Sequence, residues 1–332
     1  MPKSLKPFNT FGIDAQAAHF EAFASEAELA ALLPRAAQPL MILGGGSNVL
    51  FTRDWPGTVL HNRILGKAVL HHDGPHVHVR VGGGENWHDL VLWAVAQGFG
   101  GIENLSLIPG TVGAAPIQNI GAYGVELKDV FVQLEALDLQ NGSTRVFTKA
   151  DCQFGYRDSV FKREAKGRYA ILHVVFNLHL PPHQVHVSYG DIQRELHKNG
   201  VTAPGIADVS RAVIAIRSSK LPDPAVLGNC GSFFKNPELE QADWARLAAQ
   251  HPEAPHFPTP EGRVKVPAGW LIEQCGWKGK RVGNTGAYEK QALVLVNYGG
   301  TTGAEVKALA EAIVDAVWAR FGVRLEAEVN MI

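Results

Sequence analysis

A glycine- and proline-rich stretch at residues 100–124 constrains this chain more than any other part of it. The stretch contains six glycines and two prolines, separated by small residues such as Ser106 and Thr111. Glycine allows positive φ angles and close approach of the backbone to a ligand, while proline fixes φ and removes a hydrogen-bond donor. A regular helix or strand is therefore not expected here. An ordered loop of this length is also costly in entropy unless it has a function.

The charges around this stretch indicate how it would hold a ligand. No lysine or arginine occurs between Val81 and Leu127. Backbone N–H groups, rather than cationic side chains, would therefore bind an anionic ligand at this place. We interpret residues 100–124 as part of a cofactor-binding cradle; the alternative is a glycine-rich structural turn.

Two further glycine loops strengthen this interpretation. Residues 44–48 and 82–86 both read Gly-Gly-Gly-x-Asn, and each follows a predicted strand, at 39–43 and 76–81. Neither matches a nucleotide P-loop or the Gly-x-Gly-x-x-Gly fingerprint, so each alone is equally compatible with a tight turn. Three such loops in one half of the chain favour the cradle.

Composition excludes several classes of protein. The chain has 332 residues, of which 46% are hydrophobic and 19% charged, as in a soluble protein of two or three domains. The net charge of −1 gives no reason to expect a nucleic-acid or membrane partner. We see no secretory signal and no run long enough to span a bilayer. The three widely spaced cysteines indicate a reducing cytoplasm, and the histidines lack metal-ligand spacing.

Further patterns predict the regular elements. A strand at 170–180 ends at Pro181-Pro182, which we take as a domain boundary. Thr302 and Glu305 form a capping box for a long helix through Phe321. The last ten residues alternate apolar and polar, as in a strand. Other predicted helices and strands lie at 25–33, 87–97, 131–139, 209–218, 239–249, 268–275 and 292–297.

Three kinds of side chain are candidates for chemistry, each with an alternative. Arg157 lies between aromatic neighbours, where a surface arginine stacking on Tyr156 is equally expected. Ser232 could be a turn hydroxyl, and no Gly-x-Ser-x-Gly elbow supports a hydrolase. Glu326 and Glu328 share one face of the terminal segment, which could be solvated or could line a cleft.

Taken together, these motifs resemble a known family. Leu43-Gly-Gly-Gly-Ser-Asn48, Ile108-Pro-Gly-Thr-Val-Gly113, Gln118-Asn-Ile-Gly-Ala-Tyr-Gly124, Phe154-Gly-Tyr-Arg-Asp-Ser159 and Gly231-Ser-Phe-Phe-Lys-Asn-Pro237 occur in that order. The ensemble, over about residues 10–330, resembles the UDP-N-acetylenolpyruvoylglucosamine reductases. Tyr189 and the extended loops are similar to the type I subgroup, in which such a tyrosine closes over the nucleotide substrate.

The resemblance implies an α+β fold. We expect a two-part FAD-binding region of the vanillyl-alcohol-oxidase (PCMH) type over residues 1–182, split near 66–70. A smaller α+β substrate-binding domain with a connecting segment would cover 183–322. The terminal strand, 323–332, would return to the FAD site.

The resemblance also implies site residues. Arg157 would stabilise the reaction intermediate, Ser232 would donate a proton, and Glu328 would complete the catalytic set. Substrate contacts are implied for Tyr189, Arg217, Lys220, Asn236 and Gln291. Contacts to FAD are implied for Gly44, Gly45, Gly46, Ser47, Asn48, Gly110, Thr111, Gly113, Ala114, Asn119, Gly121 and Gly124.

The implied activity is an NADPH-dependent reduction of a C=C bond with non-covalent FAD. It would convert UDP-N-acetylglucosamine-enolpyruvate to UDP-N-acetylmuramate in peptidoglycan synthesis, and so serve cell-wall biogenesis, cell shape, the cell cycle and cell division. We expect a cytoplasmic monomer without a metal. The substrate's carboxylate suits a bidentate arginine, and a serine is a weak acid suited only to a strongly basic intermediate.

The chain departs from the family near residue 330, and two alternative functions remain open. Ala327 and Asn330 stand where the family has proline and an arginine expected near the flavin. A flavin oxidase on the same cofactor fold would often attach FAD covalently, and no such linkage is readable here. A non-enzymatic flavin- or nucleotide-sugar-binding regulator would have no use for Arg157, Ser232 and Glu328 together.

Overall fold

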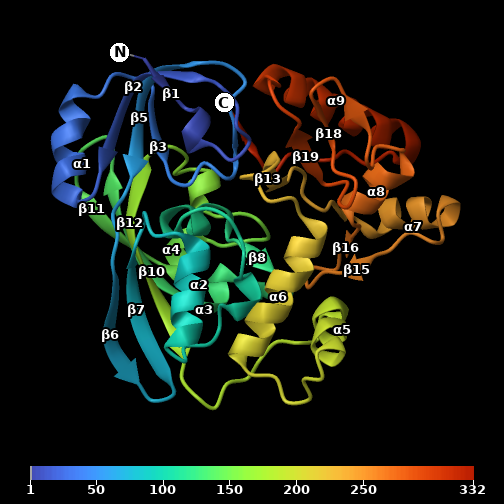
Figure 1. Ribbon diagram of the computed structural model, residues 1–332, viewed down its shortest axis with the longest axis horizontal. Helices are drawn as coiled ribbons and strands as arrows, with labels where there is room; N and C mark the ends of the chain where they lie inside the picture. Colours follow the sequence, from blue (N-terminus) through green and yellow to red (C-terminus); the bar gives the residue numbers. More distant parts are fainter. Residues whose placement is uncertain (1) are drawn as a thin grey trace. The chain divides into compact units, whose positions relative to one another are not determined.

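The computed structural model describes residues 2–332, which form two compact units (Figure 1). Unit 1 contains residues 2–3, 17–46 and 55–219, and unit 2 contains residues 4–16, 47–54 and 220–332. The units cut the chain at different points from the expected domain ranges, because 4–16 and 47–54 pack with the C-terminal part. Those ranges stay a prediction.

The first sheet of unit 1 is built mainly from parallel strands. Helix α1 (Glu26–Leu32) follows strand β2 (Gln16–Phe23), and the Ser25 side chain caps that helix by accepting from Glu28 N. Short segment η2 (Leu33–Arg35) ends the helix at its proline. The strands, in sheet order, are β1 (Lys3–Ser4), β2 (Gln16–Phe23), β5 (Trp55–Asn62) and β3 (Leu40–Leu43).

The second sheet of unit 1 is antiparallel and has five strands. Val77, Val79 and Val81 are fully buried on one face of β7 (His76–Gly82), as their alternation predicts. Helix α2 (Trp87–Ala96) packs its Trp87 in the same core and lies in front of the sheet in Figure 1. The strands, in sheet order, are β11 (Thr144–Thr148), β10 (Phe131–Asp138), β12 (Tyr169–His179), β7 (His76–Gly82) and β6 (Lys67–Asp73).

Residues 100–124 form no α-helix and no strand longer than two residues, as the glycines predict. After β12, α5 (Gly190–Lys198) and α6 (Ile206–Lys220) pack together through a small apolar core. The short elements of this half are η3 (Glu103–Leu105), η4 (Val112–Gln118), β8 (Gly121–Ala122), β9 (Val125–Glu126), α3 (Leu127–Val130), α4 (Lys149–Cys152) and η5 (Val160–Lys162).

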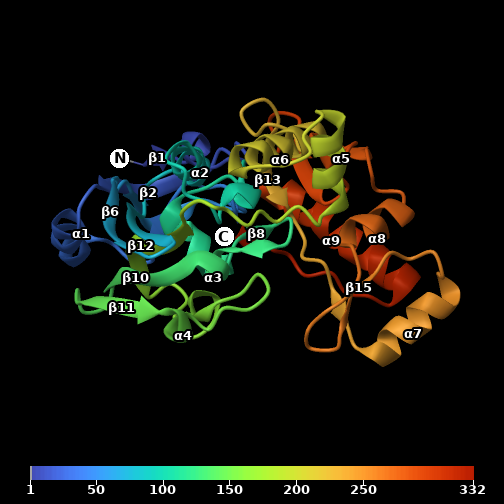
Figure 2. The same ribbon diagram turned by 90° about the horizontal axis from the view of Figure 1, so that it is seen from below.

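Unit 2 combines small β-sheets with α-helices. The Thr302–Glu305 capping box is confirmed at the start of α9 (Gly303–Phe321), which lies beside α8 (Ala268–Gln274) (Figure 2). One sheet has the strand order β13 (Gly228–Ser232), β19 (Val294–Asn297), β18 (Thr285–Ala287) and β17 (Arg281–Val282). Another has the order β14 (Glu238–Leu239), β16 (Val264–Lys265) and β15 (Phe257–Pro258). The helical elements are η1 (Lys6–Phe8), α7 (Gln241–Gln250), α8 and α9.

The last ten residues are extended but pair in two short pieces instead of forming one strand. Ala327 forms a bridge with Phe234, and β20 (Asn330–Met331) pairs in parallel with β4 (Val49–Leu50). The predicted apolar face holds, since Val323, Leu325 and Val329 are buried and Ala327 is half-buried. Across residues 2–332, no helix has the length and apolar character needed to cross a membrane.

Candidate functional site

The three glycine loops converge in unit 1. A Cβ atom on Gly44 would clash with the Thr111 hydroxyl, and one on Gly45 would lie 3.1 Å from Gly110 Cα. A Cβ on Gly113 would lie 3.0 Å from Gly83 Cα. Loops that are far apart in the sequence therefore touch through backbone, which only glycine allows at such distances. This convergence supports the cradle interpretation over three independent turns.

The first and second glycine loops, at 44–48 and 82–86, differ in whether their backbone amides donate hydrogen bonds to the protein. Gly83 N donates to Leu172 O at 2.7 Å and Gly84 N to Ile64 O at 2.8 Å, so the amides of the second loop bind protein. Among the described residues, the amides of Gly44, Gly45 and Gly46 have no hydrogen-bond acceptor. Successive unpaired amides after a strand form an anion-binding concavity. The first loop therefore fits the anionic part of a cofactor, and the second loop shapes the site.

Residues 105–107 of the glycine-rich stretch are fixed by two helices. Trp87 Nε1 donates to Leu105 O at 3.0 Å, and Ser106 Oγ lies 2.8 Å from Ser210 Oγ on α6. Leu107 has a φ of 59°, a left-handed conformation that is costly for leucine. Its N–H donates to His88 Nδ1 at 3.0 Å. The strained residue is thus held by a histidine to which the sequence assigned no role.

Protonation of His88 would remove this contact, because Nδ1 would then be a donor. Burial lowers the pKa of His88 below its usual range, and the Arg217 guanidinium lowers it further, while Asp89 raises it. The imidazole is therefore held in the neutral form that accepts the Leu107 N–H.

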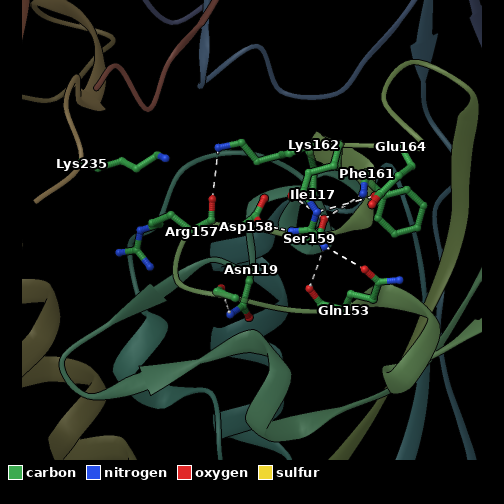
Figure 3. Close-up of polar contacts among 12 residues, drawn as sticks. Ile117, Asn119, Gln153, Arg157, Asp158, Ser159, Phe161, Lys162, Glu164 and Lys235 are labelled. Atoms are coloured by element: carbon green, nitrogen blue, oxygen red, sulfur yellow. Dashed lines mark hydrogen bonds and ion pairs between the residues drawn. The ribbon is translucent and has the colours of Figure 1, made fainter. Parts of the chain in front are cut away.

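Arg157 lies on a tight turn and points to the glycine-rich stretch (Figure 3). Its Nη2 donates to Gly121 O at 2.5 Å, and a Cβ on Gly121 would lie 3.0 Å from Arg157 Nη1. Gly121 therefore leaves room for the guanidinium. The guanidinium carbon also lies 5.4 Å from the centre of the Tyr156 ring, so the stacking expected for a surface arginine is present as well.

Tyr189 and Arg217 lie around a third residue, Tyr123. The rings of Tyr123 and Tyr189 are 5.7 Å apart in an edge-to-face arrangement, and the Tyr189 side chain is 51% exposed. Arg217 hydrogen-bonds to Tyr123. Burial raises the pKa of Tyr123 and lowers the pKa of Arg217, whose Nε is buried without a partner in the described chain. Tyr123 belongs to the 118–124 motif, and the sequence alone gives it no role.

In unit 2, Ser232 and Glu328 lie on adjoining segments. Ser232 ends β13 and pairs with Val294, and Glu328 N donates to Phe233 O at 2.8 Å. The two glutamates of the terminal segment have different surroundings. Glu326 is 73% exposed and pairs with Lys235 at 2.8 Å, whereas Glu328 is partly buried and lies near Cys230, whose pKa is raised by burial and then by this carboxylate. These surroundings favour Glu328 over Glu326.

The remaining candidates of unit 2 are spread over several elements. Asn236 Oδ1 accepts from Ala268 N at 2.9 Å, at the start of α8, and Gln291 Oε1 accepts from Leu293 N at 3.3 Å. Lys220 is the exposed last residue of α6. Asn48 Nδ2 donates to Glu328 O at 3.3 Å, and its carbonyl accepts from Asn330 Nδ2 at 3.1 Å. Ser47 belongs to the same unit.

Comparison with known proteins assigns the family. The FAD binding domain family matches residues 17–148, and the C-terminal domain of UDP-N-acetylenolpyruvoylglucosamine reductase matches residues 223–332. A reductase of that name from Azoarcus sp. (strain BH72) is 55% identical over 98% of this chain and 95% of its own length. The chain belongs to the UDP-N-acetylenolpyruvoylglucosamine reductase family. A family member from Chromobacterium violaceum is 52% identical, over 98% of this chain and 96% of its own.

The reductase family also accounts for the fold. The fold is similar to that in the crystal structure of the reductase from Thermus caldophilus, with a TM-score of 0.68 and 23% sequence identity. The match covers 100% of this chain and 98% of the Thermus chain. The predicted fold class, an FAD-binding region plus a smaller domain, is confirmed by the two family matches. The FAD-binding match contains all three glycine loops, and the reductase C-terminal match contains Ser232 and Glu328. Arg157 lies between the two matches.

Substitution of Gly45 tests the first loop. Because a Cβ would crowd Gly110 and displace the free amides, Gly45→Ala should weaken FAD binding about tenfold or more. The dissociation constant is measured by flavin fluorescence titration of the deflavinated protein. Gly205→Ala is the matched control, since its Cβ would have 3.6 Å to the nearest atom and its φ is not positive. Equal FAD affinity in both variants would contradict the assignment.

The His88 contact predicts a pH effect on stability. A folded-state pKa below the unfolded value of about 6.5 stabilises the fold above that pH, and this contribution is lost as pH falls through the folded pKa. Asparagine can keep the acceptor without titrating. The free energy of unfolding of the wild type should therefore fall relative to His88→Asn between pH 7 and pH 5, as measured by urea denaturation. Parallel curves would show that His88 does not titrate in this contact.

Proposed function

We propose that this chain reduces the enolpyruvyl group of UDP-N-acetylglucosamine-enolpyruvate to give UDP-N-acetylmuramate, with FAD as cofactor and NADPH as reductant, in peptidoglycan precursor synthesis. The observation that carries the proposal is the 55% identity along nearly the whole chain to a protein named for this reductase activity. The convergence of the three glycine loops inside the FAD-binding match supports it independently.

The residues present fit FAD. When bound, the flavin would supply hydride transfer, from NADPH to the C=C bond of the substrate. The free amides of Gly44, Gly45 and Gly46 would bind the pyrophosphate, and the loop at 110–114 would face the same ligand. The full proposed set is Gly44, Gly45, Gly46, Ser47, Asn48, Gly110, Thr111, Gly113, Ala114, Asn119, Gly121 and Gly124, and the attachment is non-covalent.

Arg157 would bind the carboxylate of the enolpyruvyl group. Reduction of the conjugated C=C bond places negative charge on the adjacent carbon and this carboxylate, and a guanidinium can donate hydrogen bonds to both carboxylate oxygens in bidentate fashion. Stabilisation of this kind contributes roughly 3–4 kcal/mol per group in comparable sites. The contact of Arg157 with Gly121 O supports the role because it orients the guanidinium before substrate binds.

Ser232 would donate the proton to carbon that completes the reduction, and Glu328 would orient it or stabilise the charge. A serine hydroxyl is a weak acid, so only a strongly basic carbon can take its proton. Tyr189, Arg217, Lys220, Asn236 and Gln291 would bind the nucleotide sugar. We assign the chain to the type I subgroup on Tyr189, and we propose a cytoplasmic monomer.

An anaerobic titration tests the activity. NADPH should bleach the yellow protein, and colour should return only after the enolpyruvyl substrate is added. Ser232→Ala should leave bleaching unchanged and slow the return of colour by about 100-fold or more, because only the second half-reaction needs the proton. Equal loss in both half-reactions would rule out the proton-donor role. Colour that returns with oxygen but not with the enolpyruvyl substrate would favour an oxidase.

The two terminal glutamates form a matched pair. Glu328→Gln should slow reoxidation of the flavin by substrate about 100-fold, whereas Glu326→Gln should change it less than about twofold, since Glu326 is exposed and paired with Lys235. Stopped-flow absorbance measures both rates. The reverse order of effects would move the catalytic carboxylate to Glu326.

A further inference from the structure

We propose that Lys162 and Asn119 are positioning residues for Arg157. They hold the turn at 155–158 in a conformation that the chain would not adopt by itself, so that the guanidinium is set before the substrate binds. This inference rests on the role proposed above for Arg157. It concerns two residues to which neither the motifs nor the proposed reaction gives this task.

The turn needs outside support because Arg157 is strained. Its φ is 52°, in the left-handed region that a residue with a long side chain rarely adopts. Gly155 and Asp158 close the turn with two backbone hydrogen bonds, at 3.0 Å and 3.3 Å. Strain of this kind persists only where the surroundings fix the residue, and it is common at functional sites.

Lys162 supplies one support, from the segment that follows the turn. Its ammonium group donates to the carbonyl oxygen of Arg157 at 3.1 Å (Figure 3). A hydrogen bond from a charged donor is stronger than a neutral one, and this one fixes the peptide plane that follows the strained φ. Lys162 is itself anchored, because its N–H donates to Ser159 O and Ser159 Oγ donates to Ile117 O at 2.6 Å.

Asn119 supplies the second support, from the other side of the turn. Its side chain is completely buried, and Nδ2 donates to Gly155 O at 2.9 Å while Oδ1 accepts from Lys128 N at 3.0 Å. Asn119 has a φ of 43°, which asparagine tolerates better than most residues. It therefore ties the turn to the same loop whose Gly121 carbonyl accepts from Arg157. The side-chain oxygen and nitrogen each have a protein partner, so the FAD contact proposed above for Asn119 would come from its backbone, and Asn119→Asp would leave that contact in place.

The two supports and the Gly121 contact act on different atoms of one residue. Lys162 holds the Arg157 carbonyl, Asn119 holds the residue two positions before it, and Gly121 O holds the guanidinium. Loss of either support would let the backbone relax towards negative φ and swing the side chain away. Misplacement by about 1 Å lowers rates by up to about 100-fold in other enzymes.

Lys162→Met tests the inference, since it removes the donor and keeps most of the side chain's length. Reoxidation of the reduced flavin by the enolpyruvyl substrate should slow about 10- to 100-fold, while reduction by NADPH and FAD content stay unchanged. Lys162→Arg should restore at least part of the rate because it keeps a charged donor. Lys166→Met, four residues away on an exposed side chain, is the matched control and should leave both rates unchanged.

Asn119→Asp is the second variant, because it keeps the acceptor for Lys128 N and removes the donor to Gly155 O. It should affect the same half-reaction. Equal slowing of both half-reactions, or loss of FAD in both variants, would mean that the residues only stabilise the fold, and would overturn the proposal. Arg157→Ala is measured in parallel. If it leaves reoxidation unchanged, the role of Arg157 fails; if it slows reoxidation and Lys162→Met does not, only the positioning role fails.

Discussion

The close contact of backbone with backbone among the glycine loops is the constraint on which the rest of unit 1 depends. Gly44 and Gly45 approach Thr111 and Gly110, and Gly113 approaches Gly83, at distances that leave no space for a side chain. Any larger residue would push the loops apart and displace the amides of Gly44, Gly45 and Gly46, which are unpaired within residues 2–332 and can face an anion. The loops that follow strands β3 and β7 both pack against residues 110–113.

Several residues with strained backbone conformations are hydrogen-bonded by single polar side chains. Leu107, Asn119, Tyr123 and Arg157 all have positive φ, and all lie in or against the glycine-rich stretch. His88 holds Leu107 through its N–H, and Lys162 holds Arg157 through its carbonyl. Such conformations need support from their surroundings and are typical of sites that must be preorganised. The strain thus marks the functional part of the unit without reference to any motif.

The sequence predicted local features well, because they depend on neighbouring residues. The Thr302–Glu305 capping box, the strand that becomes β7 and the irregular course of residues 100–124 need only short-range patterns. The alternation of the terminal segment could not choose between Glu326 and Glu328, because both lie on the same face, and only the family resemblance implied Glu328. Their difference comes from Lys235 and Cys230, which lie about a hundred residues earlier in the chain. The sequence also assigned no role to His88, Lys162 or Tyr123, whose partners are likewise distant or whose contacts involve the backbone.

The sequence by itself determined the family, the glycine loops and the residue types available for chemistry, since these are properties of the chain's order. Tertiary structure decided that the amides of Gly44, Gly45 and Gly46 stay unpaired in the described part of the chain, whereas those of Gly83 and Gly84 donate to protein carbonyls. It also decided that Gly121 leaves room for Arg157 and that both polar side-chain atoms of Asn119 form hydrogen bonds with the protein. The reason is that hydrogen-bond satisfaction and close packing are set by residues that meet only after folding, and no spacing along the chain specifies them.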